Sequence, residues 1–586
     1  MRGVPANRQY RSVAPCAQGV LGRLVLVRLA IVVLLACVAQ TATAQTIPAG
    51  EQAGRERERF IERRAPAAQP VGERISLPST AAPAGAADTM VVIRRIQIVG
   101  STVYGADQLA AMYDDMLGRR VPLQAVYDLA QRITARYGGD GYALSRAIVP
   151  PQELRPSGAS VRIEVIEGWI NKVDWPKQLA RYRDFFSVYA AKITADRPVN
   201  VRTIERYLLL ASDLPGLKFS TTLKASPNEK GASTLIVEVV EKRFEALGRI
   251  DNRGTSSRGP WQFTTSGTLN NVFGNHEAVS LLYAGAFPLE TLQFIAPSYR
   301  QVLNAEGLSF FVNGSYSWGK PGIPNQDVLK FTTRSTVVES GMSTPIVRTR
   351  ERNLTVTALF FLSESYSFLD GTAEQVDRLR GVRLRSDADF ADMLGGINQI
   401  STTFSKGING LGSTGNSSDP LGLALPGRPS VPNGRVDFTK LDIYASRLQP
   451  LPGQFSALIA GYAQYAFTSL LVPEQCGYGG RTFGRAYNPS ELLGDHCWMA
   501  SAELRYDVPG TAMPFPAVQF YGFTDRGTSY FIAPGVGTPG SQSGASAGGG
   551  VRLAWLNHLQ VDLSAAKAIE GPRNDSRFFV ISTARY

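Results

Sequence analysis

The sequence is poor in the residues that most often hold metals or carry catalysis. It has 3 histidines and 4 cysteines among 586 residues, and His276, His496 and His558 lie far apart in the chain. A structural zinc site needs clustered cysteine and histidine ligands, and none of the histidines has the spacing typical of a metal site or a catalytic triad. We therefore expect no metal, no cofactor and no enzymatic activity.

Motifs for nucleotide binding are also missing. The glycine-rich run at 410–415 matches a dinucleotide-binding pattern, but no predicted strand precedes it and no predicted helix follows it. That context gives the pattern its mechanism, so we interpret the run as a flexible loop. No Walker motif is present, which excludes the usual phosphate-binding loop of an ATPase.

Acidic residues are absent from the first 44 residues, which contain five arginines. An apolar run at 29–39 is too short to span a bilayer, and an Ala-x-Ala pattern ends at Ala44. These features predict a secretory signal peptide over 1–44, with lipoprotein processing at Cys37 as the alternative. Its removal lowers the formal net charge from +12 to +7. This surplus is spread along the chain, so we expect no nucleic-acid partner.

Long apolar runs are absent from the rest of the chain. No later stretch reaches the roughly 20 apolar residues that a membrane-spanning helix needs. A protein with this sequence can therefore cross a membrane only as a β-barrel, which satisfies its backbone hydrogen bonds between strands.

The mature N-terminus begins with a charge-dense stretch at 51–64, which predicts a helix. The next stretch, 65–87, is rich in Pro, Ala and Gly and is typical of a flexible linker. A charged helix on a long tether is a movable element. The alternative is a solvated, partly disordered N-terminus, which is common near chain ends.

Two α/β modules follow, each with the order strand, helix, helix, strand, strand. In the first module, apolar residues recur at helical spacing over 123–137 and so predict a buried helix face. The second module repeats the same order and forms an internal repeat. The predicted division of the chain is signal peptide 1–44, helix and linker 45–90, first module 91–168, second module 169–243 and barrel 244–586.

The helical pattern ends near Lys242, and short alternating segments with turn residues and aromatics follow. Outer-membrane strands need about 9–11 residues with alternating faces, so this region has room for an antiparallel barrel of about 16 strands. A soluble β-sandwich is the alternative. In the last strand, Phe578 and Tyr586 fit the two aromatic girdles, and Tyr586 fits an assembly signal, although Ser582 would face lipid and Ile581 the lumen.

Motifs in all three parts of the mature chain resemble one known family. The residues at 141–152, 204–216 and 251–254 resemble signatures of two polypeptide-transport-associated domains and of the first barrel strand. In this order they resemble the outer-membrane transporters of two-partner secretion, the haemolysin activation and secretion proteins. The resemblance covers almost the whole mature chain.

The resemblance implies two site motifs that meet in the barrel lumen. The first resembles the tip of a long loop that folds back into the barrel and comprises Phe483, Gly484, Arg485, Ala486 and Tyr487. The second, Phe523 with Asp525, resembles an aromatic-x-aspartate motif on a following strand. Arg485 should therefore pair with Asp525, unless it is an exposed loop arginine. Family members often have glycine where this chain has Ala486, which would be strained there if the position needed φ > 0.

Cys476 and Cys497 flank this predicted loop. Because the signal peptide places them in an oxidising compartment, we predict a disulfide at the base of the loop. The alternative is two unpaired thiols.

By the resemblance, the protein moves a large unfolded exoprotein across the outer membrane without ATP. The helix at 51–64 plugs the resting pore, and the periplasmic modules bind the cargo. The expected partners are this exoprotein, outer-membrane lipid and the barrel-assembly machinery. The alternatives are an insertase, which usually carries more periplasmic modules, and a passive porin, which would have none.

Overall fold

The computed structural model describes residues 49–61, 63, 65–69, 82–322, 330–416, 427–510, 513–534, 539–556 and 558–586. The predicted signal peptide lies outside the described residues, and so does the middle of the predicted linker. Within the described part of the chain, no helix has both the length and the apolar character needed to cross a membrane.

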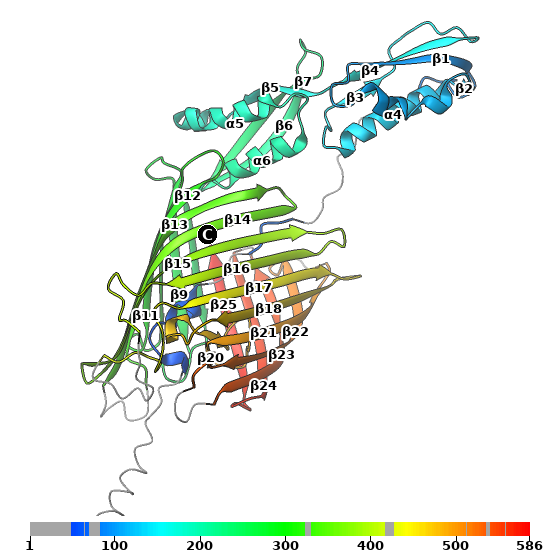
Figure 1. The fold of residues 1–586 in the computed structure, drawn as a ribbon. Helices are drawn as coiled ribbons and strands as arrows, with labels where there is room; N and C mark the ends of the chain where they lie inside the picture. The colour runs from blue at the N-terminus through cyan, green and yellow to red at the C-terminus, as the bar shows by residue number, and fades with distance from the viewer. Residues whose placement is uncertain are drawn as a thin grey trace, which may run out of the picture. The chain divides into compact units, whose positions relative to one another are not determined.

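Sixteen antiparallel strands close into a barrel, which confirms the predicted fold (Figure 1). The ring closes where β25 pairs with β8 from Ile581↔Asp251 to Arg585↔Leu247. The strands are β8 (Phe244–Asp251), β9 (Gln262–Asn270), β10 (Glu277–Ala286), β11 (Gln293–Val302), β12 (Ser309–Gly319), β13 (Phe331–Arg348), β14 (Arg352–Leu369), β15 (Thr372–Ala391), β16 (Ile397–Gly407), β17 (Thr439–Pro450), β18 (Phe455–Ala466), β21 (His496–Asp507), β22 (Ala517–Tyr530), β23 (Ser541–Trp555), β24 (Leu559–Glu570) and β25 (Ser576–Arg585).

Side chains alternate between the two faces of the barrel wall, as the period of a strand requires. In β25, Phe578 is 75% exposed whereas the next residue, Phe579, is 3% exposed. The outward face carries apolar side chains such as Leu504 and Ile459, which suits contact with lipid. The inward face carries polar and charged side chains, and these build the site described below.

The first module is a four-stranded sheet of order β2-β1-β4-β3 covered by helices. Val126, Ala130 and Ile133 of the long helix are buried against the sheet, as the helical spacing predicts. The shorter helix α3 ends at Ala110, and a turn separates it from η2. Its elements are β1 (Met90–Val99), α3 (Ala106–Ala110), η2 (Asp114–Met116), β2 (Arg120–Pro122), α4 (Gln124–Gly139), β3 (Arg146–Ile148) and β4 (Ala159–Ile166).

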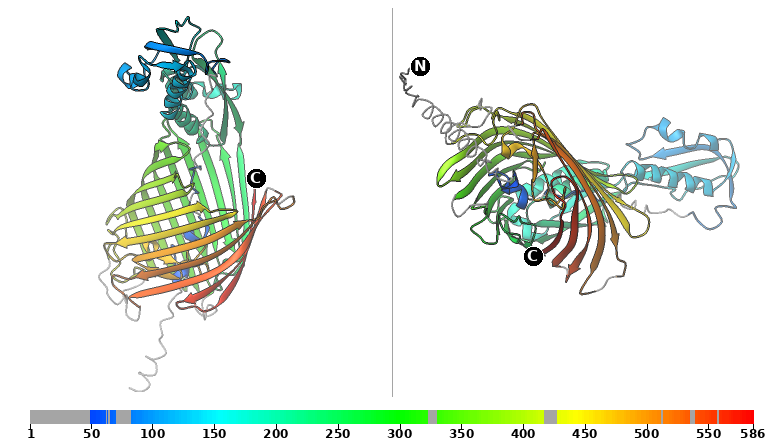
Figure 2. Two further views of the ribbon diagram at one scale, coloured as in Figure 1. Left: turned by 90° about the vertical axis from the view of Figure 1, so that its right-hand side faces the viewer. Right: turned by 90° about the horizontal axis from the view of Figure 1, so that it is seen from below.

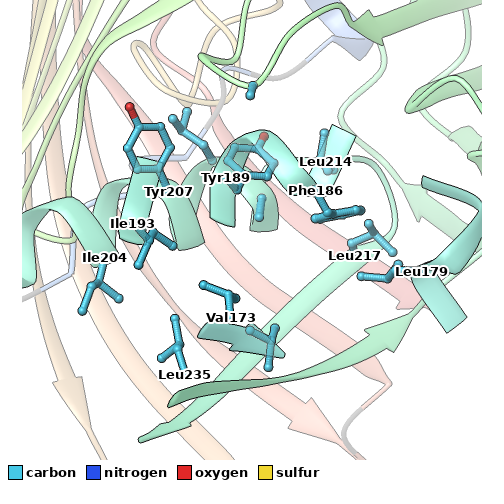
Figure 3. Close-up of a cluster of buried hydrophobic side chains, with 14 of the residues drawn as sticks. Val173, Leu179, Phe186, Tyr189, Ile193, Ile204, Tyr207, Leu214, Leu217 and Leu235 are labelled. Atoms are coloured by element: carbon cyan, nitrogen blue, oxygen red, sulfur yellow. The ribbon is translucent and has the colours of Figure 1, made fainter. Parts of the chain in front are cut away.

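The second module is a three-stranded sheet of order β5-β7-β6 with two helices. Figure 3 shows its core, in which Tyr189 from one helix lies beside Tyr207 from the other, with ring centroids 6.1 Å apart. Asn200 caps the second helix by accepting a hydrogen bond from Arg202 N, as N-cap residues do. The elements are β5 (Trp169–Asp174), η3 (Lys177–Tyr182), α5 (Arg183–Ala195), α6 (Val201–Ser212), β6 (Leu217–Ala225) and β7 (Ala232–Glu241).

The second module contacts turns at the end of the barrel where its chain enters β8. Arg348, at the end of β13, donates to both carboxylate oxygens of Asp213 at 2.6 and 2.8 Å. Glu306, in the turn after β11, accepts from Arg206 at 3.1 Å and from the Tyr207 hydroxyl at 2.9 Å. The second module therefore contacts the β11–β12 and β13–β14 turns of the barrel.

Candidate functional site in the barrel lumen

The connection between β18 and β21 (residues 467–495, here called the lumenal loop) folds back into the barrel. It contains η4 (Val472–Glu474) and a small hairpin of β19 (Cys476–Tyr478) with β20 (Leu492–Gly494). Its buried side chains pack against lumenal residues of β21 and β22 such as Met499 and Phe523. The loop therefore fills part of the space inside the ring of strands.

Glycines in the barrel wall make room for this loop. Tyr478 is fully buried over Gly527 of β22 and Gly544 of β23. A Cβ atom would lie 2.5 Å from the Tyr478 ring at Gly527 and 2.8 Å from it at Gly544. A real Cβ could not be accommodated there without moving the ring, so the close approach of loop and wall depends on glycine.

The structure brings Arg485 and Asp525 together. The Arg485 guanidinium donates to Asp525 through Nη2 at 2.9 Å and Nε at 3.2 Å, and the Arg485 backbone N–H donates at 2.9 Å. The guanidinium also lies 3.5 Å from the centre of the Phe523 ring. Arg485 is 8% exposed and Asp525 is 1% exposed. The pair is thus desolvated, and removal of Arg485 would leave the Asp525 carboxylate as a buried charge without its partner.

A second carboxylate, Glu503 on β21, also binds Arg485. It accepts from Nη1 of Arg485, from Nε of Arg505 at 2.8 Å and from Nη1 of Arg552 at 2.9 Å. The sequence motifs did not identify Glu503. The alternation of β21 could have done so, because it puts Glu503 on the same face as Ser501, which also binds Arg485.

The conformation of the loop tip differs from the expectation that Ala486 would be strained. The left-handed backbone is at Gly484, with φ of 68°, whereas Ala486 is absent from the residues with positive φ in the described chain. Ala486 is fully buried in the apolar cluster of the loop. The strain that glycine would relieve at position 486 is therefore not present, because the chain reverses two residues earlier.

The base of the lumenal loop is held by a disulfide and a buried carboxylate. The structure contains a Cys476–Cys497 disulfide that joins β19 to the start of β21. Asp495 is fully buried and accepts hydrogen bonds from Leu470 N and Ile532 N, each at 2.9 Å. The two ends of the loop and the next external connection are therefore joined near one point.

Residues 49–61 (here called the N-terminal segment) lie inside the ring of strands, as the right-hand view of Figure 2 shows for the blue helix. Glu51 is buried with Arg258 of the β8–β9 connection and binds its guanidinium. Glu51 also accepts from the Thr255 hydroxyl at 2.6 Å and pairs with Arg59 at 3.2 Å. Phe60 packs against Phe294 of β11, with ring centroids 5.4 Å apart.

The N-terminal segment also contacts the lumenal loop. Arg55 is 1% exposed and donates to the Gln475 carbonyl at 2.6 Å and to the Ser490 hydroxyl at 3.0 Å. Arg57 pairs with Glu339 of β13 at 2.6 Å. Glu339 in turn binds Arg383 at 3.0 Å. Hydrogen bonds thus link the segment to the loop, and ion pairs link it to the barrel wall.

The helix in this segment is shorter than predicted. α2 comprises Glu56–Phe60, whereas the charge pattern indicated a helix over 51–64. Gly54 has φ of 96° and Ile61 is extended, which ends the helix on both sides. Arg55 pairs with Glu58 three residues on, and Arg55 and Arg57 also bind loop carbonyls and a barrel carboxylate.

Family models match most of the described chain. The model described as "Haemolysin secretion/activation protein ShlB/FhaC/HecB" matches residues 231–552. The model described as "POTRA domain, ShlB-type" matches residues 91–168.

Two similar proteins are named as transporters. "Outer membrane transporter CdiB" of Dickeya dadantii is 23% identical over 490 residues, which cover 79% of this chain and 81% of that protein. "Heme/hemopexin transporter protein HuxB" of Haemophilus influenzae is 21% identical over 491 residues, which cover 80% of this chain and 82% of that protein.

Solved structures share the fold. CdiB from Escherichia coli superposes with a TM-score of 0.68 at 17% identity, over 87% of this chain and 94% of that one. CdiB from Acinetobacter baumannii superposes with a TM-score of 0.58 at 16% identity, over 88% of this chain and 94% of that one.

Proposed function

Because the chain belongs to the haemolysin secretion/activation protein family, whose members are two-partner secretion transporters, we propose that its lumenal loop and N-terminal segment together close the channel for its cargo. The protein is an outer-membrane transporter, and it exports an exoprotein from the periplasm to the cell surface. A 16-strand barrel is wide enough for an aqueous channel, so an element inside it is needed to keep the resting membrane sealed.

The observation that carries the proposal is the buried Arg485–Asp525 pair. It fastens the loop tip to the barrel wall by three hydrogen bonds to one carboxylate. Guanidinium and carboxylate match each other in plane and charge, so the contact has one preferred geometry. Loop withdrawal would have to break this contact.

The N-terminal segment acts as a plug in this proposal. It occupies lumenal space and is joined to the loop through Arg55. Because its chain continues through residues 65–69 toward the periplasmic turns, where Gln69 N binds the Arg350 carbonyl at 2.9 Å, the segment can leave the lumen on the periplasmic side. When the segment leaves, Arg55 no longer binds the Gln475 carbonyl, and the lumenal loop loses this contact.

The cargo binds the periplasmic modules as an added strand. In the order β5-β7-β6, strand β6 has a partner on one side, and its side chains after Phe219 are exposed. An unpaired strand edge offers main-chain donors and acceptors to an extended peptide. An unfolded exoprotein has such extended segments, which makes it a suitable ligand.

We further propose that Phe578 and Tyr586 present the assembly signal to the barrel-assembly machinery. Phe578 lies on β25 and Tyr586 directly follows it, and the two are 75% and 74% exposed. Their aromatic rings are suited to the interfaces of the outer membrane.

The test is export of the cognate exoprotein by cells that carry Arg485→Ala. We expect little cargo in the medium while the amount of folded barrel, judged by its altered gel mobility on heating, stays near the parental level. The matched control is Arg526→Ala, an exposed arginine on β22 that pairs with Glu570 at 3.0 Å. Normal export by Arg485→Ala would contradict the role of the loop.

A further inference from the structure

A cavity of about 270 Å³ in the lumen is lined by an unusual number of arginines. It lies between the lumenal loop and the wall formed by β8 and β22 to β25. Six arginines line it: Arg249, Arg253, Arg481, Arg485, Arg552 and Arg585. Asp562 is the single carboxylate among the described residues that line it.

Three of these arginines are held by carboxylates outside the cavity lining, and one of them is Arg552, which pairs with Glu503 at 2.9 Å. Arg481 pairs with Asp251 at 2.5 Å, and Arg485 pairs with Asp525 at 2.9 Å. These ion pairs fix the direction of the guanidinium groups at the cavity wall. The positions of the donors are therefore set before any ligand binds, which is the condition for a selective site.

Arg253 differs from these residues. It is 8% exposed, and within the described part of the chain its guanidinium binds carbonyl oxygens, those of Gly480 at 2.9 Å and Arg485 at 3.2 Å, with no carboxylate in ion-pair contact. It also lies 4.1 Å from the centre of the Phe579 ring. Its backbone N–H binds Asp251, but a buried guanidinium that no carboxylate contacts directly is costly. An anion in the cavity would remove that cost.

We propose that this cavity is a binding site for a tetrahedral oxyanion of the phosphate or sulfate class. Guanidinium groups bind phosphate oxygens through paired N–H donors, and several of them line one cavity here. Ser564 and Thr583 also line the cavity and supply hydroxyl groups. The oxyanion can be a free inorganic ion or the phosphate ester of a lipid headgroup.

The site shares Arg481 and Arg485 with the lumenal loop of the proposed closure, but its other residues lie outside that loop. Arg253 and Arg585 belong to the β8–β9 connection and to β25, and neither lies in the lumenal loop. An occupied cavity would bridge these parts of the barrel to Arg481 and Arg485 of the loop.

The experiment is isothermal titration of the full-length protein in detergent with inorganic phosphate, and in a parallel arm with glycerol 3-phosphate, both in a constant chloride background. We expect saturable binding near one site per chain. Tighter binding of inorganic phosphate would indicate the free ion as the natural ligand, and tighter binding of the ester would indicate a headgroup.

The variants are Arg253→Gln and Arg585→Gln, with Arg526→Gln as the control outside the cavity. Loss of a charged hydrogen-bond donor should weaken phosphate binding about tenfold in the first two, and leave it unchanged in the third. If Arg253→Gln does not give a folded barrel, Arg585→Gln decides alone. No saturable binding to the parental protein, or equal affinity in Arg585→Gln and Arg526→Gln, would overturn the proposal.

Discussion

Arg485 directs three N–H donors at one carboxylate, that of Asp525, and two of them come from its guanidinium. The backbone N–H of the same residue supplies the third. A side chain and its own main chain therefore both depend on Asp525. Loss of this carboxylate would release the backbone of the loop tip, while Glu503 and Ser501 would still bind the guanidinium.

We expect Asp525→Ala to destabilise the loop by about 1.5–3 kcal/mol, the range for losing hydrogen bonds to a charged group, because Glu503 still pairs with Arg485. The measurement is the temperature at which the folded barrel changes mobility in a detergent gel, together with protease cleavage within 467–495. Arg526→Ala is the control, because Arg526 is the next residue on β22 and pairs at the surface. Equal protease resistance in Asp525→Ala and the parent would contradict the contact.

Substitutions at the tip should differ sharply between two neighbouring positions. Gly484→Ala places a Cβ 2.6 Å from the Tyr478 ring in a backbone with φ of 68°, so we expect a loss of more than about 1 kcal/mol. Ala486→Gly removes one buried methyl group, and we expect it to lower the stability of the folded barrel by about 1 kcal/mol at most. The temperature at which each folded variant changes mobility in a detergent gel shows which substitution is more destabilising. The reverse order would show that the tip reverses at 486.

Removal of the buried contact between Glu51 and Arg258 should open the channel. Arg258→Ala leaves Glu51 and Glu56 buried without this partner, and the segment should spend more time outside the lumen. We expect a higher conductance in planar bilayers. Glu374→Gln, which alters an ion pair on β15, is the control and should leave the conductance unchanged. A conductance of Arg258→Ala equal to that of the parent would argue against the plug.

The disulfide between Cys476 and Cys497 closes a loop of 21 residues. In the chain-entropy model a link of this size stabilises by about 3 kcal/mol. Reductant should therefore lower the temperature of the mobility shift in the parent. The double variant Cys476→Ser, Cys497→Ser should already melt at the lower temperature and should not respond to reductant. A response of this variant would place the reducible bond elsewhere.

Acid should weaken the contact between the second module and the barrel at Glu306. Burial acts to raise the pKa of Glu306, but hydrogen bonds from Arg206 and Tyr207 outweigh it and lower the pKa below its ordinary value. A lowered folded-state pKa stabilises the contact above the ordinary glutamate range, about pH 4.3, and this contribution is lost as the pH falls through the folded value. Hydrogen exchange of α6 measured on either side of that range should show the loss.

The matched variant for this pH effect is Glu306→Gln. It keeps the shape of the side chain and removes the titration. Exchange of α6 in this variant should be faster at neutral pH and should change less with acid. An identical acid response in the two proteins would assign the effect to another group.

The barrel and both modules could be predicted from the sequence because their signals are local. Alternation in the strands and the helical spacing in α4 depend on residues close together in the chain. The contacts of Glu503 with Arg552, and of Glu51 with Arg258, join residues far apart in sequence. Composition and periodicity contain no information on such pairs, so these contacts needed the fold.

The N-terminal segment shows that a local sequence signal can also predict too much regular structure. Its charges suggested a longer helix, since alternating charges commonly stabilise exposed helices. In the barrel the arginines meet stronger partners, such as the Gln475 carbonyl and Glu339. Tertiary contacts therefore override the local preference.

Tyr478 rests on two glycines, Gly527 and Gly544, at the wall of the lumen. Once the loop has withdrawn, a polypeptide that passes through the barrel would contact the exposed backbone of these two glycines. A wall surface of glycine backbone has no side chains that could favour one cargo side chain over another. The glycines that let the loop fit closely would then provide a surface that accepts large and small residues alike.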